Sequence, residues 1–262
     1  MNDAELAIAV VRVGAQVVRR QFGIARKQVQ KGPRDFATSA DVGAEEAMSA
    51  VIGRERPGDA VIGEELGSGG ATDSPRTWLL DPLCGTANYF ARTRLVAVNA
   101  ALNTPDGVIA AAVADPFTAD VFWTDGESAY VRSGERDVPA RPRADSELVD
   151  LSFDPPFPNA PGFRAVGLAA DEEFTARFSP RVVSSSLALT WVATGRRAAY
   201  VTDGEIRASI DFSAGLAICE AAGCTASSLD GGSWNRAAGG LIVAADQPTH
   251  ATLVELARKQ RG

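Results

Sequence analysis

The sequence predicts an α/β fold of alternating helix and sheet layers, and three observations carry that prediction. Short apolar runs typical of strands recur along the chain, separated by turn signals. Between them lie segments whose apolar residues recur at helical spacing. With 262 residues, of which 45% are hydrophobic and 23% charged, the chain can bury a substantial core. Helices interleaved with strands in both halves favour stacked layers over an all-α or all-β fold.

The first half of the chain opens with a helix. Apolar residues recur at helical spacing from Asn2 to Phe22, with Asn2 as the expected N-cap and Gly23 directly after the end. A second helix is expected from Asp41 until Pro57 stops it. Short apolar runs then predict strands at residues 60–63, 77–80, 95–102, 107–116 and 120–123.

A polar, proline-bearing segment separates the two halves. PARPRAD, residues 139–145, interrupts the periodicity, and we expect a domain boundary there. The prediction is an N-terminal α+β half at residues 1–143 and a C-terminal α/β half at residues 144–262. In the second half the expected strands are at residues 148–153, 181–183, 197–202 and 240–245, and the expected helices are at 186–195, at 211–223 and after Pro248.

Charge and cysteine content exclude several classes of partner. A formal net charge of −7 would repel a phosphate backbone, so we expect neither nucleic acid nor an acidic membrane surface as a partner. No apolar run approaches the roughly 20 residues that cross a bilayer. Three cysteines form no even set and no CxxC pair, and no signal sequence opens the chain, which favours a reducing cytoplasm. A small phosphorylated substrate remains compatible, because a divalent cation can reverse the local field.

Acidic residues gather where the expected elements begin or end. Glu64 and Glu65 follow one strand and Asp81 follows the next, while Asp41 and Asp211 stand at helix starts. Each has an ordinary explanation by itself, because an aspartate often caps a helix and a glutamate pair after a strand is usually solvated. Strand ends and adjoining loops are nevertheless where α/β folds assemble their active sites.

The segment DPLCGT, residues 81–86, favours a functional role for these acidic residues over the ordinary explanations. Asp-Pro starts a turn, the glycine permits close backbone approach, and the threonine offers a hydroxyl where N–H groups can face an anion. Carboxylate and carbonyl oxygens beside a phosphate cradle are what Mg²⁺-assisted phosphoryl chemistry requires.

Six segments, in this order, resemble the motifs of the inositol monophosphatase family, the lithium-sensitive, Mg²⁺-dependent phosphatases that include inositol, histidinol-phosphate and phosphoadenosine phosphatases. The resemblance covers essentially the whole chain. It implies a five-layer α-β-α-β-α sandwich, as in fructose-1,6-bisphosphatase, and commonly a homodimer. The segments are DFATSAD (35–41), VIGEE (61–65), DPLCGTANYF (81–90), GVIAAAVADPFTADVFWT (107–124), SLALTWVATGRRAAY (186–200) and IDFSAGLAICEAAG (210–223).

The resemblance implies a set of metal ligands. Glu64 and Asp81, joined by the backbone carbonyl of Leu83, correspond to the ligands of one metal. Asp211 corresponds to a ligand that holds a second metal together with Asp81. One metal would make the nucleophile and the other would stabilise the leaving oxygen.

The resemblance also implies catalytic and phosphate-binding roles. Thr86, supported by Asp41, would orient or deprotonate the attacking water, and Glu64 belongs to the same catalytic group. The amides of Gly85 and Thr86 would meet the phosphate.

The segment VTDGEIRAS, residues 201–209, does not align cleanly with the family segment that carries a substrate-contacting glutamate. Asp203 or Glu205 could reach the substrate from this segment, and a solvated turn is the alternative for both.

Cys84 stands where the family has a second aspartate in the motif, a ligand of the second metal. Mg²⁺ selects hard oxygen donors, whereas a thiolate suits softer ions, so Mn²⁺ or Zn²⁺ are alternatives. Three interpretations stay open. The cysteine is a thiol-specific ligand or redox switch, a neutral replacement in an active enzyme, or the mark of a relative that no longer catalyses.

The expected function is therefore a metal-dependent phosphatase that hydrolyses a small soluble phosphomonoester of the inositol-phosphate, histidinol-phosphate or nucleotide type. The attacking group would be a metal-activated water. The alternative is a catalytically impaired homologue that binds a phosphorylated metabolite or a protein partner as a scaffold.

Overall fold

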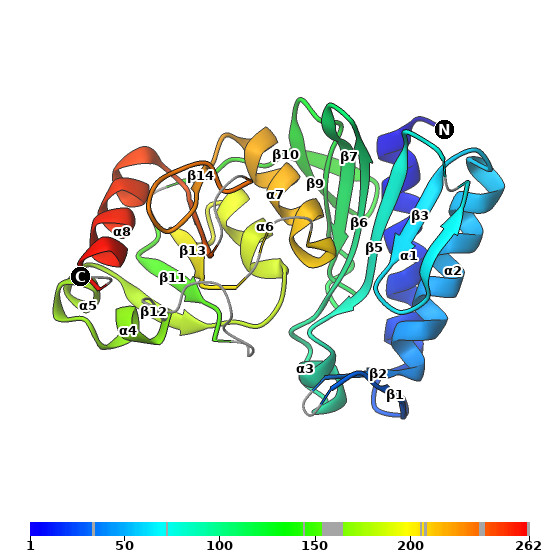
Figure 1. Ribbon diagram of the computed structural model, residues 1–262, viewed down its shortest axis with the longest axis horizontal. Helices are drawn as coiled ribbons and strands as arrows, with labels where there is room; N and C mark the ends of the chain where they lie inside the picture. Colours follow the sequence, from blue (N-terminus) through cyan, green and yellow to red (C-terminus); the bar gives the residue numbers. More distant parts are fainter. Residues whose placement is uncertain are drawn as a thin grey trace. The chain divides into compact units, whose positions relative to one another are not determined.

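The computed structural model describes residues 1–32, 35–71, 73–143, 145–153, 165–204, 206, 209–235 and 239–260. The chain forms two compact units, each built on its own sheet (Figure 1). The division at residue 143 into two contiguous halves stays a prediction about domains. The two compact units are a separate description, and each collects segments from distant parts of the chain. The first unit contains Met1–Pro139, Ser185–Leu187 and Ile210–Ile218, and the second contains Ala140–Ser184, Ala188–Ser209 and Cys219–Gly262.

An eight-stranded mixed sheet forms the centre of the first unit, with strand order β10-β9-β8-β7-β6-β5-β3-β4. Most neighbours are antiparallel, but β3 pairs with β5 in parallel. As a result the ends of β3 and β5 reach the same edge of the sheet. The strands are β3 (Ala60–Gly63), β4 (Gly67–Gly70), β5 (Thr77–Cys84), β6 (Ala97–Thr104), β7 (Gly107–Ala114), β8 (Val121–Thr124), β9 (Ala129–Ser133) and β10 (Arg136–Pro139).

Two long helices, α1 (Asp3–Gln21) and α2 (Ser39–Glu55), pack against each other and against this sheet (Figure 1). The expected cap of α1 is confirmed, because the Asn2 side chain accepts a hydrogen bond from the Glu5 N–H at 2.8 Å. α2 begins two residues before the predicted start. Thr38 is its N-cap, and Asp41 completes a capping box from the third helical position.

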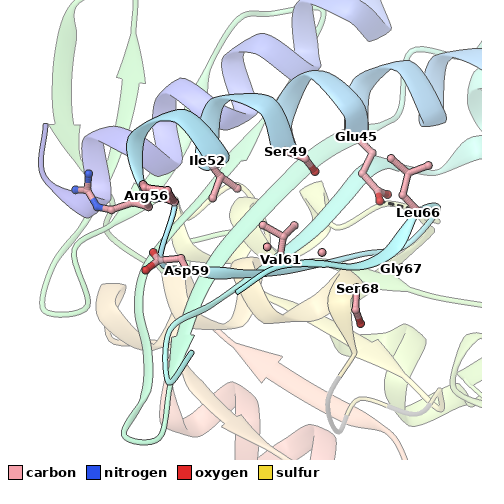
Figure 2. A pocket seen from close by; sticks show the side chains of 13 residues that line it. Glu45, Ser49, Ile52, Arg56, Asp59, Val61, Leu66, Gly67 and Ser68 are labelled. Atoms are coloured by element: carbon pink, nitrogen blue, oxygen red, sulfur yellow. Dashed lines mark hydrogen bonds between the residues drawn. The ribbon is translucent and has the colours of Figure 1, made fainter. Parts of the chain in front are cut away.

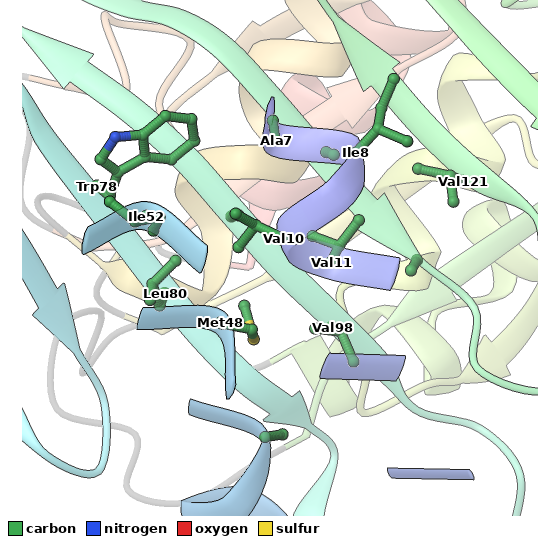
Figure 3. Packing of buried hydrophobic residues seen from close by; sticks show 14 of the residues in the cluster. Ala7, Ile8, Val10, Val11, Met48, Ile52, Trp78, Leu80, Val98 and Val121 are labelled. Carbon is green, nitrogen blue, oxygen red and sulfur yellow. The ribbon is translucent and has the colours of Figure 1, made fainter. Parts of the chain in front are cut away.

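The core of the first unit fills the space between the helix pair and the sheet. Figure 3 shows Val10 and Val11 of α1 and Met48 and Ile52 of α2 beside Trp78 and Leu80 of β5; all six are buried. Burying one such side chain contributes about 1.5–3 kcal/mol. This packing fixes the strand that continues into the DPLC segment, so the position of the acidic residues depends on it.

Smaller elements complete the first unit. The hairpin of β1 (Lys27–Gln30) and β2 (Phe36–Thr38) and the short helix α3 (Thr86–Phe90) were not expected from the sequence. β5 also continues through residue 84, beyond the predicted end at 80. The Asp-Pro pair is accommodated by a register irregularity between Asp81 and Cys84, where a bulge lets proline sit in a strand.

The second unit is built on a five-stranded sheet with the order β12-β11-β13-β15-β14. β11 pairs in parallel with β12 and β13, and β15 pairs antiparallel with β13 and β14. Helix α8 (Gln247–Lys259) packs on β14 and β15 and begins one residue before Pro248 instead of after it. The strands are β11 (Leu148–Leu151), β12 (Ser179–Val182), β13 (Ala199–Thr202), β14 (Thr225–Ser227) and β15 (Leu241–Ala244).

The remaining helices are short apart from α7. They are α4 (Ala165–Ala170), α5 (Glu172–Arg177), α6 (Leu187–Ala193) and α7 (Ile210–Ala222). Helix α7 contributes its first residues, Ile210–Ile218, to the first unit. In the described part of the chain, no helix has both the length and the hydropathy that crossing a bilayer requires.

Candidate metal centre and active site

Three carboxylates converge in the first unit. Glu64, Asp81 and Asp211 each offer an oxygen, and these oxygens lie within 4.8 Å of one another. Glu64 follows β3, and its N–H donates to the carbonyl of Leu80 at 3.1 Å, which continues the parallel pairing with β5. Asp81 lies in β5 itself, and Asp211 lies in the first turn of α7. The structure thus brings together three of the predicted ligands.

Asp81 is the most enclosed of the three and is only 1% exposed. Its Oδ1 accepts from the Leu83 N–H at 3.0 Å, and its Oδ2 accepts from the Asn99 side-chain amide at 2.9 Å. Burial, and then the neighbouring charges of Glu64 and Asp211, raise the pKa of Asp81 well above its usual range. Burial and Glu64 likewise raise the pKa of Asp211 to about 6. A cation between these carboxylates would relieve the repulsion that contributes to both shifts.

A lysine that the sequence motifs did not indicate lies beside this cluster. Lys31 Nζ is 2.8 Å from Glu64 Oε1 and 2.7 Å from Glu65 Oε1. Burial alone would lower the pKa of Lys31, but its hydrogen bonds to both glutamates outweigh burial and raise it. Burial raises the pKa of Glu65 to about 7 despite this partner. The ammonium group therefore supplies positive charge at the edge of the three-carboxylate cluster.

Glu45 of α2 fixes the turn that carries Glu64. Its carboxylate accepts from the N–H groups of Glu65 and Leu66, both at 2.8 Å, and the residue is 1% exposed. The same carboxylate reaches one end of a cavity of about 310 Å³ between α2 and the β3–β4 hairpin (Figure 2). Arg56 and Asp59 lie at the other end. None of the three clustered carboxylates lines this cavity, so it is separate from the candidate centre.

Thr86 and Asp41 form the pair that the resemblance implies. Thr86 Oγ1 lies 2.9 Å from Asp41 Oδ1 and 3.1 Å from the carbonyl oxygen of Leu83, and its one proton can go to either acceptor. The other oxygen of Asp41 accepts from the Thr38 N–H at 2.9 Å and from the Thr38 hydroxyl. Asp41 is fully buried, and burial raises its pKa despite these donors.

Gly85 provides the turn between β5 and α3. Its φ of 101° lies in the left-handed region that favours glycine. Its carbonyl accepts from the Tyr89 N–H at 3.0 Å, and the Tyr89 hydroxyl donates to the carbonyl of Val18 at 2.6 Å. The turn is thereby anchored to α1. Phosphate binding by the amides of Gly85 and Thr86 stays a prediction.

Cys84 lies next to the cluster without belonging to it. Among the described residues, the group of mutually close ligand atoms contains the three carboxylates alone. Cys84 Sγ accepts the Ser186 N–H at 3.2 Å. Burial, and then the charges of Asp81 and Asp211, raise the pKa of the Cys84 thiol well above its usual value. The raised pKa favours the neutral thiol, and the role of Cys84 as a ligand stays a prediction.

The two substrate candidates of the segment 201–209 have different outcomes. Asp203 is 1% exposed, and its Oδ2 accepts from the Ala165 N–H at 3.1 Å within the second unit. A role in substrate binding stays a prediction for this residue. Glu205 lies outside the described residues.

The sequence motifs did not indicate three polar residues that lie at the candidate centre. Lys31 gave no signal, because the strand before it, KQVQ, is exposed throughout. Asn99 gave a weak one, since it is the polar residue in the apolar run LVAVNAAL. Ser186 approaches from a distant part of the chain, so only the tertiary structure reveals it.

Comparisons with known proteins identify related sequences. A model of the inositol monophosphatase family matches residues 2–261. An inositol-1-monophosphatase of Caulobacter vibrioides is 32% identical over 260 residues, covering 96% of this chain and 99% of the relative. The Nus factor SuhB of Escherichia coli is 27% identical over 237 residues, covering 87% of this chain and 85% of the relative.

The fold is shared with solved structures as well. The Thermotoga maritima IMPase superposes with a TM-score of 0.82 over the whole of both chains at 21% identity. The predicted layered α+β sandwich of the inositol monophosphatase and fructose-1,6-bisphosphatase type is thereby confirmed. The chain belongs to the inositol monophosphatase family of phosphoric monoester hydrolases.

Proposed function

We propose that the protein hydrolyses a small phosphomonoester with the help of Mg²⁺ held by Glu64, Asp81 and Asp211. The observation that carries this proposal is the convergence of three carboxylate oxygens within 4.8 Å of one another. Three carboxylates this close can all be ionised only with positive charge beside them, and among the three Lys31 forms an ion pair with Glu64.

The donor set fits a hard cation. All three ligands are carboxylates, which Mg²⁺ prefers, and the Leu83 carbonyl offers a further oxygen near Thr86. When bound, the cation supplies Lewis acidity and neutralises charge that develops on the phosphoryl group.

Thr86 and Asp41 orient the attacking water. When Asp41 Oδ1 accepts the Thr86 proton, a lone pair of Thr86 Oγ1 is left free to accept a hydrogen bond from water. The Thr38 N–H donates to the other oxygen of Asp41, which fixes the orientation of the Asp41 carboxylate. Proximity and orientation of this kind are general sources of rate acceleration.

Cys84 weakens a second cation position in this proposal. A protonated thiol brings no charge, so Asp81 and Asp211 are the carboxylates available there. We therefore expect half-maximal activity at a higher Mg²⁺ concentration than in relatives with aspartate in this position. Mn²⁺, which binds the same carboxylate and carbonyl oxygens, is the expected substitute.

The substrate class, compartment and assembly complete the proposal. A net charge of −7 favours a small phosphorylated metabolite over a polyanion. Cytoplasmic location is supported by the cysteine pattern, and a homodimer is supported by the family resemblance.

The test is phosphate release from a panel that contains inositol 1-phosphate, histidinol phosphate and 3′-phosphoadenosine 5′-phosphate, with Mg²⁺, Mn²⁺ or Zn²⁺. We expect turnover of at least one substrate by the wild type and loss of that turnover in Asp81→Asn and Asp211→Asn. Asp106→Asn, in the exposed turn between β6 and β7, is the matched control and should keep full activity. Absence of turnover with every substrate and metal contradicts the proposal.

The scaffold function is the second candidate. Two observations favour it: the neutral Cys84 in the motif, and the similarity to a relative named as a Nus factor. Cys84→Asp separates the candidates. An inert wild type whose Cys84→Asp variant gains activity would mark the cysteine as the change that silenced the site.

A further inference from the structure

We infer that Asn99 and Ser186 are positioning residues that hold Asp81 in the orientation needed to bind a cation, and that Cys84 serves as the anchor of Ser186. The inference rests on the proposed function, because it takes Asp81 to be a cation ligand. It assigns a role to Cys84 that needs no bond between sulfur and metal.

The first step is the pairing of β5 with β6. Asp81 and Asn99 stand directly opposite each other in this antiparallel ladder. Asn99 is 1% exposed, and its Nδ2 donates to Asp81 Oδ2 at 2.9 Å. Opposite residues on one face of a sheet have neighbouring side chains, so the strand pairing itself brings the amide to the carboxylate.

The second step is the orientation of the Asn99 amide. A carboxylate only accepts hydrogen bonds, so the NH₂ group must face Asp81 and the carbonyl oxygen must face away. That oxygen accepts from Ser186 Oγ at 2.9 Å. Ser186 is 4% exposed and Asn99 1% exposed, so water has little access to this place. Without the Ser186 hydroxyl, the buried Asn99 oxygen would therefore lose its donor.

The third step is the anchoring of Ser186. Its N–H donates to Cys84 Sγ at 3.2 Å, and Cys84 pairs with Ala97 on the same two strands. Ser186 is thus bonded to β5 through the Cys84 sulfur and to β6 through the side-chain amide of Asn99. The position of the Ser186 hydroxyl follows from these two contacts.

The consequence is a preorganised ligand. Asp81 Oδ1 is held by the Leu83 N–H and Oδ2 by Asn99, so each oxygen has one fixed donor and keeps a lone pair for a cation. Groups that orient a metal ligand in this way typically change metal affinity about 10–100-fold when they are removed.

The experiment measures Mn²⁺ binding to the metal-free, full-length protein by isothermal titration calorimetry. We expect about tenfold weaker binding for Asn99→Ala. Ser186→Ala should weaken binding several-fold, whereas Ser186→Thr, which keeps the hydroxyl, should retain the wild-type Kd. Asn103→Ala removes the same side chain four residues further along β6, opposite Thr77, and should leave the Kd unchanged.

Thermal unfolding without metal shows whether each variant is folded. If Asn99→Ala does not fold, the comparison of Ser186→Ala with Ser186→Thr decides. Wild-type Kd values for both alanine variants overturn the inference, and so does equal weakening by Ser186→Ala and Ser186→Thr.

The outcomes separate this inference from the proposed function. A wild type that binds Mn²⁺ but hydrolyses no phosphomonoester contradicts the phosphatase proposal, while the Kd ratios still decide the roles of Asn99 and Ser186. A wild type that binds no divalent cation overturns both.

Discussion

The carboxylate of Glu45 packs directly against the backbone of Gly63, so closely that a Cβ on Gly63 would lie 1.8 Å from Glu45 Oε1. No side chain fits at residue 63 while Glu45 holds the N–H groups of Glu65 and Leu66. The glycine of the VIGEE segment is therefore explained by steric contact with α2, and the contact sets the position of the adjacent Glu64.

Gly63→Ala should destabilise the protein by about 1–3 kcal/mol, because the Glu45 side chain or the strand must shift. The displaced turn should also weaken Mn²⁺ binding through Glu64. Chemical denaturation and calorimetry measure the two effects. Gly53→Ala is the matched control, since a Cβ there meets nothing within 4 Å and alanine favours the helix. Equal stability of the two variants would contradict the steric account.

Lys31→Met should bind divalent cations several-fold more tightly than the wild type. The Lys31 ammonium lies 2.8 Å from Glu64 Oε1 and competes with a cation for that carboxylate. Mn²⁺ titration measures the change. Lys27→Met removes a lysine from the same hairpin that contacts the Phe36 ring instead of a carboxylate, and it should leave the affinity unchanged. Weaker binding by Lys31→Met would show that the lysine assists the cation.

Mg²⁺ should raise the melting temperature of the wild type and leave that of Asp81→Asn unchanged. A cation at about 100 times its Kd stabilises a protein by about 2.7 kcal/mol. Without metal, Asp81→Asn should gain no stability over the wild type, because its amide NH₂ would face one of the two donors, the Leu83 N–H or the Asn99 amide, that bond to the carboxylate oxygens. Differential scanning fluorimetry with Mg²⁺ and with chelator tests both statements. A wild type that melts at the same temperature in both solutions would count against the metal centre.

His250 should make the protein less stable as the pH falls below about 6.5. Burial lowers the pKa of His250 in the folded protein, where Nε2 lies 2.7 Å from Ser227 Oγ. The unfolded chain then binds a proton that the folded chain resists, so this contribution to stability is present above the unfolded pKa and is lost as the pH falls.

His250→Gln lacks this proton-binding group. We expect the difference in unfolding free energy between wild type and variant to shrink as the pH falls from neutral to about 5, as measured by urea denaturation. A difference that stays constant over this range would show that His250 does not titrate differently in the two states.

Local signals in the sequence predict the elements with strong periodicity. Asn2 marks the start of α1, and apolar runs mark β3 and β5, so these signals alone put Glu64 and Asp81 at the ends of two strands, which the structure pairs side by side. Asp211 requires the family resemblance, because an aspartate at a helix start is ordinary.

Pairing between distant segments could not be predicted from local signals. The β1–β2 hairpin has an exposed first strand and lacks the alternation that indicates a half-buried strand, so Lys31 could not be placed. The contact of Asn99 with Ser186 joins residues 87 positions apart, and no periodicity encodes it.

Helix α7 has a consequence for the order in which the protein can mature during synthesis. Residues Ile210–Ile218 belong to a unit whose other members come mainly from Met1–Pro139, so the first unit is not encoded by one continuous stretch of chain. The β5 carboxylate can be in place early, but the third carboxylate leaves the ribosome only with α7. A nascent chain that ends before Asp211 has just two of the three clustered carboxylates, so the complete cluster can form only after the start of α7 has been synthesised.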